Sequence, residues 1–245
     1  YDLNEVEAKI CKYREAKSED GTVSYHIVTN ITTFYPEGGG QIGDTGKLIS
    51  SADEIQVIDS YRDSGDIIHL TKKLPSNLES YVKLKIATKR RSLIEANHTG
   101  THLLHQALRN ILGDHVEQRG SMISDEMFRF DFSHPSKLSS SDLHSINSFI
   151  NSKIKESIPL VENREEDYDT AINNGAIGLF TEKYEDKVRT VKFNESYELC
   201  GGTHAKNTSK LKTFSIISEV SQAFGIRRIT ATCNEEIILK ELEKK

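Results

Sequence analysis

Hydrophobic positions in the first third of the chain come in short runs, separated by clusters of glycine, aspartate and serine. The runs are β-branched or alternate with polar residues, as in strands that bury one face, and they lie at 25–31, 55–58 and 81–87. Between the first two stands FYPEGGGQIGDTG (34–46), which holds five of the chain's 15 glycines. Because glycine frees the backbone and admits a close ligand, this segment is predicted to be a loop. Residues 1–88 are therefore predicted to form a small antiparallel β-barrel-like domain.

After residue 88 the hydrophobic spacing becomes that of helices. An apolar stripe over 93–112 predicts a helix that ends at Gly113, because glycine suits the position after a last helical turn. Serines followed by a regular stripe predict a second helix over 139–159, and the charged C-terminal segment predicts a third. Alternating runs predict strands at 127–132, 188–193, 214–220 and 226–232. Residues 89–245 are thus expected to form an α/β two-layer domain, and the fold class is α+β.

Composition and charge narrow the class of protein. A chain of 245 residues with 36% hydrophobic residues buries a real core, and the lack of a bilayer-spanning run or secretory signal predicts a cytoplasmic protein. The three cysteines are odd in number and widely spaced, which disfavours a disulfide framework. Net charge of −5 disfavours indiscriminate nucleic-acid binding. Any RNA contact would depend on local clusters such as 89–91 and 227–228, each of which is more simply interpreted as solvated surface.

The predicted long helix contains NHTGTHLLH (97–105), with three histidines on one edge of its apolar stripe, where we expect them to be half sheltered. His98 and His105 are separated by about 10.5 Å along a helix, too far to share an ion. The pairs His98/His102 and His102/His105 are each close enough to chelate, and a separation of four is the recurrent choice for zinc on helices. Two helical imidazoles leave a tetrahedral zinc ion short of two ligands.

The segment ELCGGTH (198–204) offers the missing ligand types. Its two consecutive glycines disfavour a helix and let Cys200 and His204 curl around an ion. Either motif alone is weak, but together they supply the one cysteine and three histidines of a four-coordinate Zn²⁺ site. Thr99 stands where a zincin protease carries glutamate, which disfavours a peptidase. The two glycine-rich loops favour a zinc site beside a substrate cleft over a purely structural one.

Five segments resemble the editing domain of alanyl-tRNA synthetase and its free-standing relatives, the AlaX trans-editing proteins. They run in order from about Thr33 to Thr232: FYPEGGGQIGDTG, NHTGTHLLHQALRNILGDHVEQRGSMISDEMFRFDFSH, GAIGLFTEKYEDKVRTVKF, ELCGGTH and GIRRITA. The resemblance implies a zinc-dependent deacylase that hydrolyses mischarged Ser-tRNA(Ala), and possibly Gly-tRNA(Ala). It places the zinc ligands at His98, His102, Cys200 and His204.

The resemblance also implies roles for residues outside the ligand set. Gln118 matches the position that senses the serine hydroxyl. Gly39, Gly40 and Gln41 match the glycine motif that lines the site. We expect Gln41 to help supply the attacking water, while the simpler interpretation makes it a turn residue between glycines.

Four further candidates come from the residues themselves. Thr99 and Thr101 lie beside the helical ligands, where one hydroxyl could distinguish serine from alanine by a hydrogen bond. Alternatively each hydroxyl bonds back to the carbonyl four residues earlier. Arg227 and Arg228 are neighbours in a predicted strand and should point to opposite faces, so at most one reaches a tRNA phosphate.

The chain shows no ATP-binding aminoacylation domain, so it is not expected to charge tRNA. Its first residue is Tyr, and its closing helix resembles the connector that follows synthetase editing domains, which favours an excised domain over an AlaX protein with the same activity. A zinc-stabilised tRNA-binding module without catalysis is a rival from another class. A threonyl-type editing domain shares the HxxxH element but is not expected to carry FYPEGGGQ.

Overall fold

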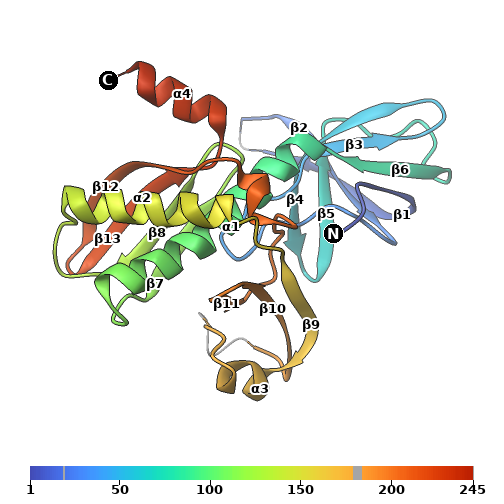
Figure 1. Ribbon diagram of the computed structural model, residues 1–245. Helices are drawn as coiled ribbons and strands as arrows, with labels where there is room; N and C mark the ends of the chain where they lie inside the picture. Colours follow the sequence, from blue (N-terminus) through green and yellow to red (C-terminus); the bar gives the residue numbers. More distant parts are fainter. Residues whose placement is uncertain (19, 179–183, 245) are drawn as a thin grey trace. The chain divides into compact units, whose positions relative to one another are not determined.

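The computed structural model describes residues 1–18, 20–178 and 184–244, and it forms two compact units (Figure 1). Unit 1 consists of Tyr1–Gly38 and Ile42–Arg91, and unit 2 consists of Gly39–Gln41 and Ser92–Lys245. The expected division into domains at residues 88 and 89 stays a prediction about independent folding. Among the described helices, none combines the length and the apolar character that crossing a membrane requires.

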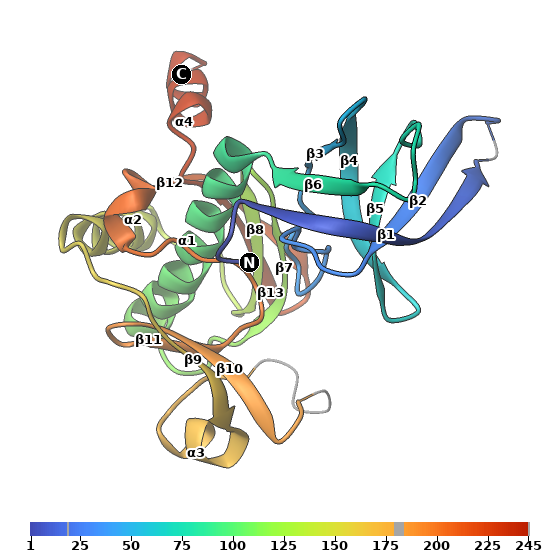
Figure 2. The same cartoon turned by 90° about the vertical axis from the view of Figure 1, so that its right-hand side faces the viewer.

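Unit 1 is built on a closed barrel of antiparallel strands, in the order β1-β2-β5-β4-β3-β6 (Figure 2). The strands are β1 (Glu5–Lys17), β2 (Val23–Thr29), β3 (Gly46–Ile49), β4 (Glu54–Asp63), β5 (Asp66–Thr71) and β6 (Tyr81–Ile86). Strand β6 shows why they form: Val82, Leu84 and Ile86 are buried, and the residues between them are exposed, because side chains alternate along a strand. The predicted barrel is confirmed.

Segment 34–46 is closely packed where it joins the barrel. Asp44 is buried and pairs with the guanidinium of Arg91, which is also buried and donates to the carbonyl of Thr33 at 3.1 Å. A Cβ on Gly43 would overlap the carbonyl of Ser60, so this glycine is required by chain packing. Interpreting cluster 89–91 as solvated surface is therefore wrong for Arg91, because its charge is neutralised inside unit 1.

Unit 2 contains two antiparallel sheets. The larger has the order β12-β13-β8-β7, and helices α1 and α2 lie on one face of it (Figures 1 and 2). The smaller has the order β11-β10-β9, with α3 packed against it through Ala171, Val188 and Leu199. The helices are α1 (Thr88–Leu112), α2 (Ser140–Lys155), α3 (Tyr168–Asn173), α4 (Glu235–Glu243) and the short 3₁₀ helix η1 (Thr208–Leu211). The strands are β7 (Gln118–Ile123), β8 (Phe128–Ser133), β9 (Val161–Asp167), β10 (Lys187–Phe193), β11 (Ser196–Leu199), β12 (Ser215–Ala223) and β13 (Ile226–Thr232).

The core of unit 2 follows the predicted patterns. Phe128, Phe130 and Phe132 alternate along β8 and are fully buried, and Ile146, Ile150 and Ile154 form the buried stripe of α2. Helix α2 begins with a capping box in which Ser139 and Asp142 satisfy each other's backbone N–H groups. The α+β fold class is confirmed. Residues 179–183 of the motif GAIGLFTEKYEDKVRTVKF lie outside the described residues.

Several strands were missed in the sequence because they do not show a clean alternation. Strand β9 reads VENREED and is mostly exposed, and it is held by pairing with β10 rather than by burial. Strand β1 carries charged residues along most of its length because only a few of its side chains enter the barrel. In both cases backbone pairing with a neighbouring strand overrides local hydrophobicity.

His69, on β5, gives unit 1 a pH-dependent stability. Its Nδ1 donates to the carbonyl of Ile27 at 3.0 Å, and its Nε2 accepts from the Thr32 hydroxyl at 2.7 Å, so the neutral ring is fully paired. Burial lowers the pKa of His69 from 6.5 to about 4. Between these pH values, His69 is protonated in the unfolded chain and neutral in the folded barrel. The free energy of unfolding therefore falls as the pH drops.

We expect this group to reduce the free energy of unfolding of unit 1 by up to about 3 kcal/mol between pH 6.5 and pH 4. Hydrogen exchange of the β2 and β5 amides across this range measures the loss in the barrel itself. His69→Gln, which does not titrate, should show a shallower pH dependence than the natural chain. The same dependence in both proteins would contradict the prediction.

Candidate metal centre

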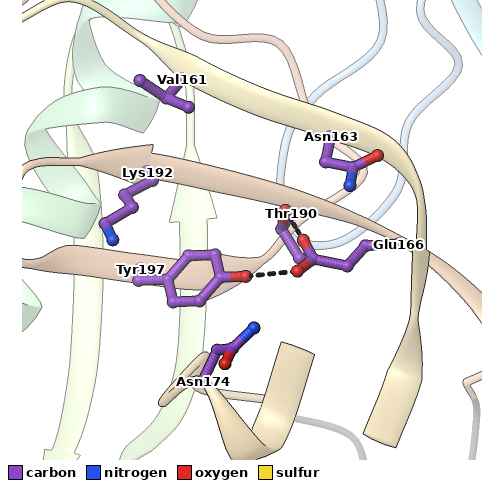
Figure 3. A pocket seen from close by; sticks show the side chains of 7 residues that line it. All are labelled: Val161, Asn163, Glu166, Asn174, Thr190, Lys192 and Tyr197. Atoms are coloured by element: carbon purple, nitrogen blue, oxygen red, sulfur yellow. Dashed lines mark hydrogen bonds between the residues drawn. The ribbon is translucent and has the colours of Figure 1, made fainter. Parts of the chain in front are cut away.

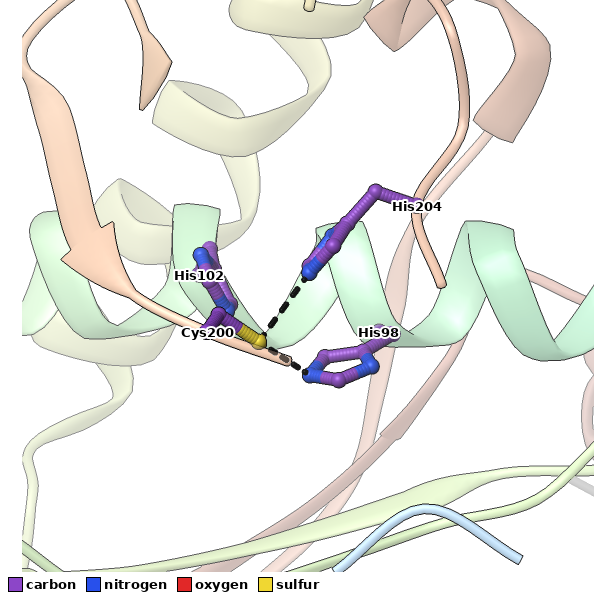
Figure 4. Close-up of side chains that lie close together, drawn as sticks. All are labelled: His98, His102, Cys200 and His204. Atoms are coloured by element: carbon purple, nitrogen blue, oxygen red, sulfur yellow. Dashed lines mark hydrogen bonds between the residues drawn. The ribbon is translucent and has the colours of Figure 1, made fainter. Parts of the chain in front are cut away.

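Helix α1 and the turn after β11 bring four metal-binding side chains together in unit 2 (Figure 4). His98 and His102 come from successive turns of α1, and Cys200 and His204 come from the ELCGGTH segment. One potential ligand atom from each residue lies within 4.8 Å of those of the others. The two motifs that were paired in the sequence therefore meet in space.

All three histidines of α1 are buried, so the expectation that they are half sheltered is wrong. Burial lowers the pKa values of His98, His102 and His204, which keeps the three rings of the cluster neutral with a lone pair available. Burial also raises the pKa of the Cys200 thiol to about 11. Metal binding at Cys200 is therefore coupled to loss of the thiol proton.

Hydrogen bonds behind two of the rings decide which nitrogen faces the cluster. The carboxamide oxygen of Gln41 lies 2.7 Å from His98 Nδ1, and because that oxygen can only accept, Nδ1 carries the proton. Nε2 of His98 is then free of hydrogen and lies 3.4 Å from Cys200 Sγ. His204 is arranged alike, with Nδ1 3.2 Å from the Thr99 hydroxyl and Nε2 3.3 Å from Cys200 Sγ.

Gln41 is itself held in one orientation. Its carboxamide oxygen also accepts from the backbone N–H of Thr203 at 3.0 Å, and its nitrogen donates to the Thr203 hydroxyl at 3.0 Å. The side chain is completely buried. These contacts favour a positioning role toward His98. The expected role in supplying water stays a prediction.

His102 has a different partner, the buried carboxylate of Glu198. Its Nε2 lies 3.6 Å from Glu198 Oε2, and its Nδ1 is buried with no hydrogen-bond partner among the described residues. The other oxygen of Glu198 accepts from His105 Nδ1 at 3.0 Å. Burial by itself raises the pKa of Glu198, but His102, His105 and Arg109 together outweigh burial and hold the pKa below its usual value.

These contacts separate the two histidine pairs that the sequence left open. His105 supports Glu198 and lies outside the cluster, so the pair with a separation of four is the one that faces Cys200. Glu198 was missed as a site residue, although it is the first residue of ELCGGTH. A carboxylate behind a metal-binding histidine fixes the ring, and this pattern recurs in metal sites.

The donor set fits a metal ion. One thiol and three neutral imidazoles make the four-ligand set typical of closed sites for borderline-soft divalent ions. The unpartnered Nδ1 of His102 and the fixed proton on His98 Nδ1 leave ring nitrogens available for coordination. The cluster can therefore hold a metal ion.

Arg189, on β10, holds the turn that carries Cys200. Its Nη1 donates to the carbonyls of Cys200 and Gly202, each at 2.7 Å, and its Nε and Nη2 donate to Glu162 at 3.0 and 2.7 Å. Two carbonyls two residues apart are thereby drawn to one guanidinium. This fixes the curl that directs Cys200 and His204 toward the α1 histidines, and nothing in the sequence pattern singled out Arg189.

The two glycines of the turn have different functions. A Cβ on Gly202 would overlap the His98 ring and crowd the Gln41 oxygen, whereas a Cβ on Gly201 would meet nothing within 4 Å. Gly202 is therefore required by the close approach of the turn to a ligand ring, and Gly201 is not.

The glycine motif of loop 34–46 contacts β7 inside unit 2. Gly40 has a φ of +83° and its carbonyl accepts from the N–H of Ile123 at 2.7 Å, and a Cβ there would crowd Ser121. Gly39 also has positive φ, at +59°. Gln118, on β7, donates from its carboxamide nitrogen to the Ser121 hydroxyl at 3.2 Å.

The remaining candidates have protein partners. The Thr101 hydroxyl donates to the carbonyl of Asn97 at 2.9 Å, which is the local back-bonding that the sequence left open. Arg227 pairs with Glu219, and Arg228 donates twice to Asp131, at 2.6 and 2.7 Å. Both arginines are thus ion-paired, and their roles toward tRNA stay predictions.

A cavity of about 490 Å³ lies on the smaller sheet (Figure 3). Its carboxylate, Glu166, accepts from the Thr190 hydroxyl at 2.6 Å and from the Tyr197 hydroxyl at 2.9 Å. None of the predicted site residues lines it; the lining residues are Val161, Asn163, Glu166, Asn174, Thr190, Lys192 and Tyr197.

Comparison with known proteins places the chain in a class. Residues 188–230 match the family model "Threonyl and Alanyl tRNA synthetase second additional domain", and residues 1–91 match the model "tRNA synthetases class II (A)". Both models describe parts of aminoacyl-tRNA synthetases, so this is the class of protein that the chain resembles.

Individual relatives narrow the class to one family. Alanine–tRNA ligase from Christiangramia forsetii is 49% identical over 96% of this chain and 27% of that protein. The enzymes from Flavobacterium psychrophilum and Bacteroides fragilis are 43% and 45% identical, over 97% and 94% of this chain and 28% and 26% of their own lengths. The resemblance is confirmed: nearly the whole chain matches one part of alanine–tRNA ligases. It spans about a quarter of the length of these relatives.

Replacing Gly202 should damage the metal centre, whereas replacing Gly201 should not. In Gly202→Ala the new methyl group displaces the His98 ring, so we expect metal affinity to fall by at least about 10-fold. Gly201→Ala, the matched control, should bind metal as the natural chain does. Calorimetric titration of the metal-free proteins with Zn²⁺ measures both affinities, and equal affinities for the two variants would contradict this account of the turn.

Removing the guanidinium of Arg189 should loosen the Cys200 turn. We expect Arg189→Met to lower metal affinity by about 10- to 100-fold, as is usual when a residue that orients ligands is lost. Arg164→Met is the control, because Arg164, on β9, also donates to Glu162, at 2.9 Å. The same titration compares them. A loss of similar size in both variants would assign the effect to Glu162 rather than to the turn.

Proposed function

We propose that this chain is an editing deacylase that hydrolyses the ester of mischarged Ser-tRNA(Ala), and also that of Gly-tRNA(Ala). The observation that carries the proposal is the cluster of three buried histidines and one cysteine, with potential ligand atoms within 4.8 Å of one another, in a chain 49% identical to part of an alanine–tRNA ligase. Two motifs that resemble those of editing domains supply the donors: NHTGTHLLH supplies His98 and His102, and ELCGGTH supplies Cys200 and His204.

The ion that fits the donor set best is Zn²⁺, held by His98, His102, Cys200 and His204. When bound, zinc supplies positive charge that orients an aminoacyl group or polarises its ester carbonyl. Because four side chains complete a tetrahedral set, we favour these two roles over activation of a metal-bound water.

The chain's own residues then divide into positioning and recognition groups. Gln41 and Thr99 hold the His98 and His204 rings, and Glu198 does the same for His102. Gln118 is the candidate for sensing the serine hydroxyl, because its carboxamide oxygen accepts no hydrogen bond from the described residues. Gly39 and Gly40 line the site as bare backbone, and Thr101 supports the helix.

We further propose that the chain works on the acceptor end of tRNA(Ala), in the cytoplasm and beside other synthetase domains, since the matched relatives are about four times longer. Aminoacylation is not expected from these residues alone. Arg227 and Arg228 remain candidates for tRNA contact only if a phosphate displaces their carboxylate partners.

A zinc-stabilised tRNA-binding module without catalysis is the second candidate, because four protein ligands are also the hallmark of structural sites. Cys200→Ala separates the two. For an editing enzyme, deacylation collapses while the far-ultraviolet circular dichroism spectrum and the tRNA affinity persist. For a binding module, the variant loses stability and tRNA affinity together.

The deciding measurement is release of the amino acid from Ser-, Gly- and Ala-tRNA(Ala). We expect rapid hydrolysis of Ser-tRNA(Ala) and slower hydrolysis of Gly-tRNA(Ala). The rate on Ala-tRNA(Ala) should be at least about 100-fold lower than on Ser-tRNA(Ala), because a site that hydrogen-bonds the serine hydroxyl discriminates strongly. A chelator should abolish activity and added Zn²⁺ should restore it.

Ser-tRNA(Thr) is the control for a threonyl-type editing domain and should be spared. Equal rates on seryl and alanyl esters would remove the editing proposal. Full activity in protein from which the metal has been stripped would remove the zinc proposal.

A further inference from the structure

A cavity of about 400 Å³ opens on the surface of unit 1, against β3, β4, β6 and the first residues of α1. Three lysines and one carboxylate line this cavity. Its charged and hydrogen-bonding side chains include Lys47, Lys85, Lys89, Glu54, Gln56 and Thr88. We call this cavity the barrel groove. Its lining carries an excess of positive charge in a chain whose net charge is −5.

The arrangement of two of the lysines is unfavourable for the barrel by itself. Lys47 on β3 stands directly opposite Lys85 on β6 in the antiparallel register. Like charges at such a position destabilise a sheet, by up to about 1 kcal/mol. The repulsion within such a pair is offset when an anion lies between the two ammonium groups.

Internal partners neutralise these lysines only in part. Lys47 pairs with Glu54 at 2.6 Å, which uses the carboxylate that lines the groove. Within the described part of the chain, the one carboxylate that Lys85 reaches is Glu5, at 3.9 Å, and Glu5 already pairs with Lys83 at 3.3 Å. Lys85 is also half exposed, at 52%. Its charge is therefore available to a ligand that carries negative charge.

We propose that the barrel groove binds the sugar–phosphate backbone of RNA, with Lys85 and Lys47 as phosphate contacts and Lys89 beside them. This inference rests on the proposed function for the choice of RNA as the polyanion. Lysine ammonium groups act as point charges toward phosphates, and polar groups such as Gln56 and Thr88 suit the sugar and phosphate oxygens. The site adds affinity without reading sequence, as backbone contacts do.

The test uses the full chain and uncharged, fluorescent tRNA(Ala), so that binding is measured without hydrolysis. Lys85→Gln should weaken binding by about three- to tenfold and reduce the slope of log affinity against log salt by about 1, the signature of one lost phosphate contact. Lys83→Gln is the matched control: Lys83 lies two residues away on the same strand, also pairs with Glu5, and does not line the groove. Its affinity and slope should match the natural chain.

A substitution of opposite sign sharpens the test. Glu54→Gln removes the carboxylate of the groove and releases Lys47, so we expect tRNA to bind about two- to fivefold more tightly. Thermal unfolding of each variant checks that the barrel is intact. Unchanged binding in both Lys85→Gln and Glu54→Gln would overturn the proposal, as would equal losses in Lys85→Gln and Lys83→Gln.

Deacylation kinetics separate this proposal from the proposed function. If both hold, Lys85→Gln raises KM for Ser-tRNA(Ala) and leaves kcat unchanged. If the chain binds tRNA through the groove but does not hydrolyse the ester, the binding results stand and the deacylase proposal fails. If hydrolysis is normal and the variants bind alike, the groove proposal fails by itself.

Discussion

Unit 2 brings four metal-binding side chains together in one place, and three of them are buried. Three buried, neutral imidazoles face the partly buried thiol of Cys200, and an unsatisfied buried polar group costs roughly 1–3 kcal/mol. Such a cluster is favourable when a cation accepts the lone pairs, because the ligand bonds replace the lost contacts with water. Helix α1, the turn after β11 and loop 39–41 all meet at this point.

The contacts behind the ligands make the cluster specific. Each ring has a separate partner: Gln41 for His98, Thr99 for His204 and Glu198 for His102. These partners come from three different parts of the chain, and Arg189 adds a fourth by holding the Cys200 turn. Rings that cannot rotate would hold a bound metal ion in one fixed geometry.

Glycines and positively charged side chains have different structural roles at different places in the two units. In unit 1, Gly43 lets two backbone segments touch, and the buried Asp44–Arg91 pair joins loop 34–46 to the start of α1. In unit 2, Gly202 makes room for a ligand ring. Positive charge is likewise divided: Arg91 and Arg189 act inside the protein, and Lys85 remains at the surface. Residue type alone therefore does not reveal function in this chain.

The sequence by itself determined the α+β class, the barrel, the alternating phenylalanines of β8, the stripe of α2 and the four cluster residues. Each of these follows from local periodicity or from the chemistry of two short motifs, and both can be recognised in the amino-acid sequence alone. The family resemblance suggested Gln41 for water supply, and the sequence suggested Thr99 for serine recognition. Both roles stay predictions, and in the structure the two side chains contact the His98 and His204 rings. The sequence missed Glu198 and Arg189, because a carboxylate or a guanidinium shows its partners only when distant strands are paired.

Only the tertiary structure decided which of the α1 histidines face Cys200 and which one supports Glu198, because that depends on the direction from which the turn approaches the helix. It also decided that Arg227 and Arg228 are ion-paired and that Lys47 and Lys85 oppose each other, since strand register sets both. Spacing along a chain predicts which residues share a face. The partner that each face meets is fixed by contacts between distant segments, such as Gln41 and Thr203, which are 162 residues apart, and those contacts exist only in the folded protein.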